Sequence, residues 1–222
     1  MLQRIVRGAA AVCALSFSLS FHGARAAPVI SEIFYDASGS DAGLVFLELF
    51  GSPGESLAGL VVEGVNGGDG GVYKTFTLSG VMPADGVFVI GDDAGGGVTA
   101  VPGADLVADI DFQNGPDSVV LRNAGGILDA VGYGAFGGGA VFAGEGSPAP
   151  DPSAGSSIAR VNPLLDTNDN SLDFVVLATP TPGSVPVSAV PLPAAVWLFL
   201  SGLVGVVTAG RRWSRWGASP PA

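Results

Sequence analysis

Three glutamates, Glu32, Glu48 and Glu63, are the side chains of this chain whose chemistry could support catalysis. A glycosidase needs only two carboxyl groups at a suitable separation, one acting as an acid and the other as a base or nucleophile. Each of these glutamates, however, lies in a short apolar run, where a strand presents its polar face to solvent. We therefore expect the three glutamates to occupy solvent-facing strand positions. The alternative is that two of them serve a carboxylate-based glycosidase.

Side-chain oxygens at alternate positions mark residues 166–173, which read Asp-Thr-Asn-Asp-Asn-Ser-Leu-Asp. The candidate ligands for a cation are Asp166, Asn168, Asn170 and Asp173. Ca²⁺ takes about six to eight oxygen ligands, which makes this segment a candidate calcium site. Ser171 and Leu177 stand where an EF-hand requires glycine and glutamate, so the segment is not an EF-hand. The alternative is an Asx-rich turn whose side chains bind their own backbone.

The first 26 residues have the pattern of a secretory signal peptide. Arg4 and Arg7 precede an apolar stretch at 8–21, and the small-x-small motif that follows predicts cleavage between Ala26 and Ala27. The stretch is too short to cross a bilayer, which disfavours the alternative of an uncleaved anchor.

The one cysteine and the one histidine, Cys13 and His22, both lie in this leader. Their removal excludes Ser-His-Asp and Cys-His catalysis in the mature protein. It also excludes metal sites that are built on histidine or cysteine. We therefore expect a noncatalytic protein that requires no cofactor, with Ca²⁺ as the one candidate ion.

Charge is distributed unevenly along the chain. All 20 acidic residues lie between Glu32 and Asp173, a stretch that holds only three basic residues, Lys74, Arg122 and Arg160, so its net charge is −17. Such a surface repels the phosphate backbone of nucleic acids. The sequence therefore predicts no nucleic-acid partner and favours a cation as counterpart.

Short apolar runs between glycine, aspartate and proline clusters indicate the elements that position these residues. The predicted strands are 29–35, 44–50, 57–63, 72–78, 87–90, 106–112, 118–122, 127–133 and 173–177. In 45–50 the apolar residues alternate with period 2, as in a half-buried strand. The pattern predicts an all-β antiparallel sandwich over 27–178, with the Gly-, Ala- and Pro-rich residues 135–157 as a long loop or insertion.

The order of these runs resembles the lamin-tail domain. Residues 29–36 (VISEIFYD) are similar to the opening strand of that family, 45–50 (VFLELF) to its second strand and 173–183 (DFVVLATPTPG) to its closing phrase. Residues 57–60 (LAGL) stand where the family usually has Leu-Ser-Gly-Trp. The resemblance implies an immunoglobulin-like β-sandwich with a binding or scaffolding role, and it supplies no catalytic residues.

The C-terminal part of the chain has the features of a membrane anchor. Residues 191–210 are uncharged and are long enough for a transmembrane helix of about 30 Å. The basic residues Arg211, Arg212 and Arg215 follow at once and predict that the body lies on the non-cytoplasmic side. Residues 179–189, with three prolines, are predicted to be a spacer between body and membrane.

This C-terminus also resembles a sorting signal. The residues concerned are Val190, Pro191, Leu192, Pro193 and Ala194, and with the helix and the basic tail they resemble the V-P-L-P-A variant of PEP-CTERM signals over 190–222. The resemblance implies recognition by an exosortase, a membrane transpeptidase of Gram-negative bacteria, and delivery to the surface or extracellular matrix. Leu192 replaces the glutamate of the commoner motif.

The prolines of this signal predict that 190–222 is a transient address that is removed at the destination. Pro191 and Pro193 keep the backbone extended, the form that a transpeptidase can bind. The alternative is that they begin the helix.

Together these features predict an exported, noncatalytic structural or binding protein. Its expected partners are the exosortase and exopolysaccharide or other surface proteins. The alternative from a different functional class is a Ca²⁺-dependent adhesive module.

Overall fold

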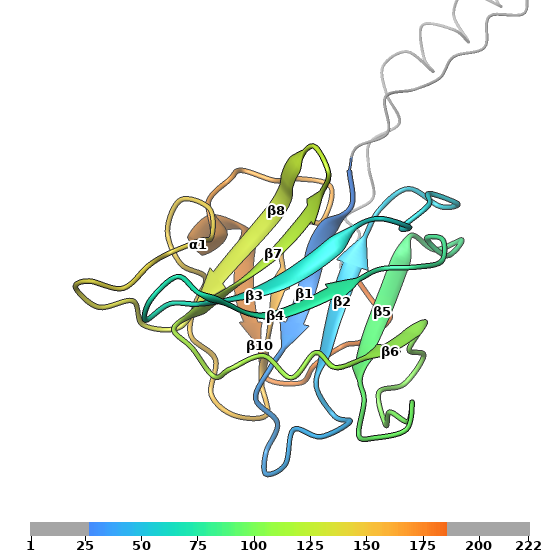
Figure 1. The fold of residues 1–222 in the computed structure, drawn as a ribbon, viewed down its shortest axis with the longest axis horizontal. Coiled ribbons are helices and arrows are strands. Elements are labelled where there is room, and N and C mark those ends of the chain that lie inside the picture. The colour runs from blue at the N-terminus through green and yellow to red at the C-terminus, as the bar shows by residue number, and fades with distance from the viewer. Residues whose placement is uncertain (1–26, 186–222) are drawn as a thin grey trace, which may run out of the picture.

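The computed structural model describes residues 27–185, which form two packed β-sheets and one short helix (Figure 1). The predicted signal peptide, the sorting motif, the helix at 191–210 and the basic tail lie outside the described residues. Within 27–185 no helix is long and apolar enough to cross a membrane. The one helix found there is α1, Asn170–Asp173.

The larger sheet has six strands. These are β1 (Val29–Phe34), β2 (Phe46–Phe50), β5 (Val87–Asp92), β6 (Leu106–Ala108), β9 (Ser157–Arg160) and β10 (Phe174–Leu177). Their order is β10-β9-β1-β2-β5-β6, and only β5 and β6 pair in parallel. Strand β9 was not predicted, because four residues that include an arginine do not stand out as an apolar run.

The smaller sheet has four antiparallel strands. These are β3 (Val61–Asn66), β4 (Val72–Thr77), β7 (Asp117–Asn123) and β8 (Gly126–Tyr133), in the order β4-β3-β7-β8. The turn from β7 to β8 is set locally: the Asn123 side chain accepts from the Gly125 backbone N–H at 2.7 Å, and Gly126 takes a φ of 142° that other residues avoid.

The core lies between the two sheets. Leu47 and Leu49 of β2 point into it, as their alternation predicts, and meet Val119, Leu121 and Val131 of the smaller sheet in one apolar cluster. The expectation of an all-β protein with two sheets is thus confirmed.

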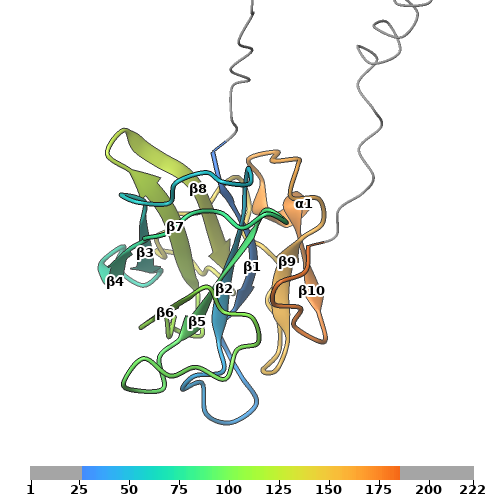
Figure 2. The same cartoon turned by 90° about the vertical axis from the view of Figure 1, so that its right-hand side faces the viewer.

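After β10 the chain turns back across the outer face of the six-stranded sheet. Residues 178–185, which we call the C-terminal strap, lie on this face rather than extending away from it (Figure 2). The segment predicted as a spacer is therefore packed on the body as far as Val185.

Candidate functional site

Two of the three candidate glutamates lie side by side beneath the C-terminal strap. Glu32 on β1 is directly opposite Glu48 on β2 in the antiparallel register. Both are buried, with 1% and 0% of their surface exposed, so the expectation that they face solvent is wrong. The alternation assigned them correctly to the outer face of the sheet, but the strap covers that face. Glu63 lies on β3 of the other sheet and pairs with Arg122.

Hydrogen bonds satisfy all four oxygens of this glutamate pair. Thr181 of the strap donates to Glu32 twice, from its backbone N–H to Oε1 at 2.9 Å and from its hydroxyl to Oε2 at 2.7 Å. Ser157 donates to Oε1 of Glu32 at 2.5 Å. Glu48 accepts from the Ser31 hydroxyl at 2.8 Å and from the backbone N–H of Gly183 at 2.7 Å. The pair therefore binds the strap to the sheet.

Burial alters the acidity of Glu48. It raises the pKa of Glu48 to about 7, and the neighbouring charge of Glu32 acts in the same direction. The hydrogen bonds from Ser31 and Gly183 oppose the shift. A carboxyl group with a pKa near neutrality suits general acid catalysis, but a substrate cannot reach Glu48 while the strap is in place.

An apolar cluster reinforces the attachment of the strap. Val185 packs against a cluster on the outer face of the sheet whose buried members are Phe46, Val87, Val89 and Val101. The C-terminal strap thus covers apolar surface that the outer face of the sheet would otherwise expose to water.

Three of the four predicted calcium ligands, Asp166, Asn170 and Asp173, accept hydrogen bonds from other groups of the protein. Asn170 is buried, and its side-chain oxygen accepts from the backbone N–H groups of Gly132 at 2.9 Å and Glu145 at 3.0 Å. Asp173, also buried, accepts from Thr167 through both its backbone N–H and its hydroxyl. Asn170 thus joins the 166–173 segment to the rest of the sandwich, whereas the bonds from Thr167 to Asp173 lie within the segment.

The remaining residues of the segment form local turns. Asp166 accepts from the backbone N–H of Asn168, which has a φ of 56°, and Asp169 caps α1 by accepting from the backbone N–H of Ser171. This geometry is that of the Asx-rich turn, the alternative reading of the sequence.

A buried arginine next to this segment is the feature that the sequence did not reveal. Arg160 on β9 has no exposed side-chain surface. Its Nη2 donates to both oxygens of Asp129 on β8, at 3.0 and 2.9 Å, and its Nη1 donates to Asp173 at 3.0 Å and Asp166 at 3.3 Å. Because Asp129 also accepts from the backbone N–H of Ile30, this cluster ties the two sheets together.

Three carboxylates at the edge of this cluster could hold a cation. Oxygens of Asp129, Glu145 and Asp166 lie within 4.8 Å of one another, and Oε2 of Glu145 is buried without a hydrogen-bond partner. Burial, followed by the charges of Asp129 and Asp166, raises the pKa of Glu145 to about 7. Only Asp166 of this group was predicted, since the three residues are far apart in the sequence.

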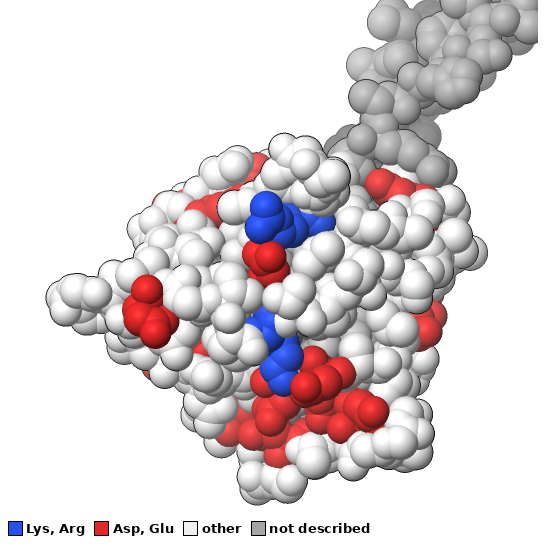
Figure 3. Space-filling view, viewed as in Figure 1, with Lys and Arg blue, Asp and Glu red and all other residues white. Residues whose placement is uncertain are grey.

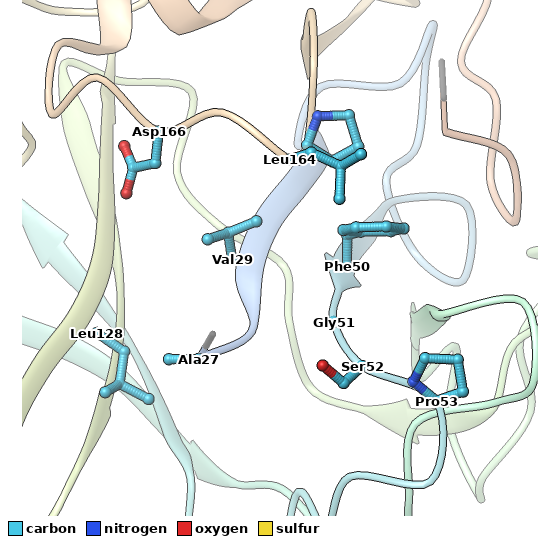
Figure 4. A pocket seen from close by; sticks show the side chains of 10 residues that line it. Ala27, Val29, Phe50, Gly51, Ser52, Pro53, Leu128, Leu164 and Asp166 are labelled. Carbon is cyan, nitrogen blue, oxygen red and sulfur yellow. The ribbon is translucent and has the colours of Figure 1, made fainter. Parts of the chain in front are cut away.

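An apolar pocket lies at the end of the sandwich where β1 begins and β2 ends (Figure 4). Its volume is 460 Å³. The lining residues are Ala27, Val29, Phe50, Gly51, Ser52, Pro53, Leu128, Pro163, Leu164 and Asp166. A concave apolar site with few polar groups is typical of a pocket that binds an apolar ligand.

Comparison of the sequence with protein families and with curated proteins finds no relative. No protein-family model matches this chain, and a search of curated proteins finds no match. The lamin-tail and PEP-CTERM resemblances stay predictions from the sequence.

Proposed function

We propose that this chain is an exported, noncatalytic structural or binding protein with an immunoglobulin-like body of the lamin-tail type. The observation that carries the proposal is the use of Glu32 and Glu48, the two candidate catalytic carboxylates that lie together, as attachment points for the C-terminal strap. Their oxygens are committed to Thr181, Gly183 and neighbouring serines and are closed to a substrate.

The charge of the body argues against nucleic acid as a partner. Each of the three basic residues in 27–185 is already paired with a carboxylate, Lys74 with Asp109 at 2.6 Å, Arg122 with Glu63 and Arg160 within its buried cluster. Acidic side chains gather at one end of the face shown in Figure 3. Such a surface repels polyanions such as nucleic acids and favours a cation as its counterpart.

The C-terminal sorting signal completes the proposal. After Val185, the last described residue, only residues 186–189 precede the motif that begins at Val190. An exosortase-type transpeptidase would recognise 190–194 and release the body from its membrane helix to the cell surface or matrix of a Gram-negative bacterium.

Replacing Pro191 and Pro193 by alanine tests this proposal. In a strain with an active sorting enzyme we expect the unchanged protein to lose residues 211–222, whereas the double variant stays full length in the inner membrane. The mature C-terminus, identified by mass spectrometry of membranes and medium, decides the outcome. Recovery of the unchanged protein with Arg211 still attached would contradict it.

A second candidate is a Ca²⁺-dependent adhesive module. The observation that favours it is the group of oxygens from Asp129, Glu145 and Asp166, in which the buried Oε2 of Glu145 lacks a partner. These three acids and Asp173 have a single positive charge beside them, that of Arg160. A bound cation would balance the excess of negative charge.

A further inference from the structure

The end of the sandwich near Ala27 carries an apolar pocket. The pocket there is walled by Val29, Phe50, Pro53, Leu128 and Leu164 (Figure 4). Next to it, Leu164 and Leu165 expose 52% and 57% of their surface. Asp166 is the one charged residue in the lining.

Both ends of the described chain lead to this part of the molecule. Ala27 itself lines the pocket. The C-terminal strap runs along β2, with Gly183 bound to Glu48, and Val185 then packs against the apolar cluster of the outer face, as does Phe50, another residue of the pocket wall. Figure 2 shows the start of β1 and the end of the strap in the upper half of the body.

The link from this end to the predicted membrane helix is short. Five residues, 186–190, separate Val185 from that helix. Five residues span at most roughly 20 Å when fully extended. While the helix anchors the chain, this link holds the pocket end of the body close to the bilayer.

We propose that the pocket and the adjoining Leu164 and Leu165 form a docking surface for the lipid bilayer, used while the chain is still tethered. This inference rests on the C-terminal membrane helix of the proposed function. Lipid is the occupant that we infer, because the short C-terminal link brings the bilayer close to the pocket.

The docking is apolar and weak. A body with 20 acidic and three basic residues gains no electrostatic attraction from anionic lipids. A few leucines alone do not hold a protein on a membrane, but a short tether supplies a high local concentration. The contact therefore ends when the tether is cut, which allows the body to leave for its destination.

Single cysteines test the docking, because the mature chain has no thiol of its own once the leader with Cys13 is removed. Leu164→Cys and, independently, Leu165→Cys are labelled with an environment-sensitive fluorophore in the chain that retains its helix. The matched control is Val98→Cys, which is 61% exposed in the loop after β5, at the opposite end of β2 from Phe50. The labelled proteins are reconstituted in phosphatidylcholine vesicles that contain brominated lipid.

We expect at least a twofold stronger quenching by brominated lipid at positions 164 and 165 than at 98. Cutting an inserted protease site between Val185 and Val190 should abolish that difference. Quenching at 164 and 165 equal to that at 98, in protein that resists carbonate extraction, would overturn the docking surface alone. Extraction of the protein by carbonate would refute the membrane helix, and with it the proposed function on which docking rests.

Discussion

Glu48 makes the stability of the protein depend on pH. Its pKa rises from 4.5 to about 7 on folding because the carboxyl group is buried. Folding therefore favours the protonated form, and the stabilisation is complete below about pH 4.5 and is lost as the pH rises through 7. The shift corresponds to roughly 3 kcal/mol at one residue. Glu145 acts in the same direction.

We expect the free energy of unfolding to fall between pH 5 and pH 8 and the Glu48→Gln variant to show a shallower fall. Urea unfolding at several pH values measures both. Glu63→Gln, which removes a carboxylate from the other sheet, serves as the control and should keep the full slope. An unchanged slope in Glu48→Gln would show that Glu48 does not titrate in this range.

At the scale of elements, the buried Arg160 joins β9 to β8 and to α1. A buried ion pair is weak evidence for net stabilisation, but the loss of one partner leaves an uncompensated charge. In Arg160→Met the carboxylates of Asp129 and Asp173 would remain buried without their cation.

Arg160→Met is therefore expected to destabilise the protein by about 3–5 kcal/mol in urea unfolding. The matched control is Arg122→Met. Arg122 makes a comparable pair with Glu63 at 3.2 Å, but 44% of its side chain is exposed. Exposed pairs contribute about 1 kcal/mol or less. Equal effects of the two substitutions would contradict a special role for the buried cluster.

At the scale of the whole molecule, the excess of acidic residues complicates any test of calcium. Any added cation screens the repulsion among these acids, and it therefore raises stability even when the protein has no specific site for it. A site for Ca²⁺ predicts more: millimolar Ca²⁺ should raise the melting temperature above that in NaCl of equal ionic strength, because binding to the folded state alone stabilises it.

Glu145→Gln provides the specific control for this measurement. The variant should lose the extra effect of Ca²⁺ and keep the general effect of salt, since only one ligand of the Asp129, Glu145 and Asp166 group is changed. Equal melting temperatures in Ca²⁺, NaCl and EDTA at matched ionic strength would rule out the adhesive module.

The sequence alone determined the features that depend on neighbouring residues. The alternation in 45–50 predicted which side chains of β2 enter the core, and glycine and aspartate clusters marked the turns. The Asx-rich turn at 166–171 was one of the two interpretations of this segment, because its hydrogen bonds join residues two positions apart. The two-sheet architecture followed from these local patterns.

Only the tertiary structure decided how the polar residues are used. A period of two says on which face of a sheet Glu32 and Glu48 lie, but not that a segment 149 residues after Glu32 covers that face. Likewise, the partners of Arg160 come from β8 and from the turn before β10. Such contacts depend on the path of the whole chain, and the cost of burying unpaired polar groups then selects the pairs that are made.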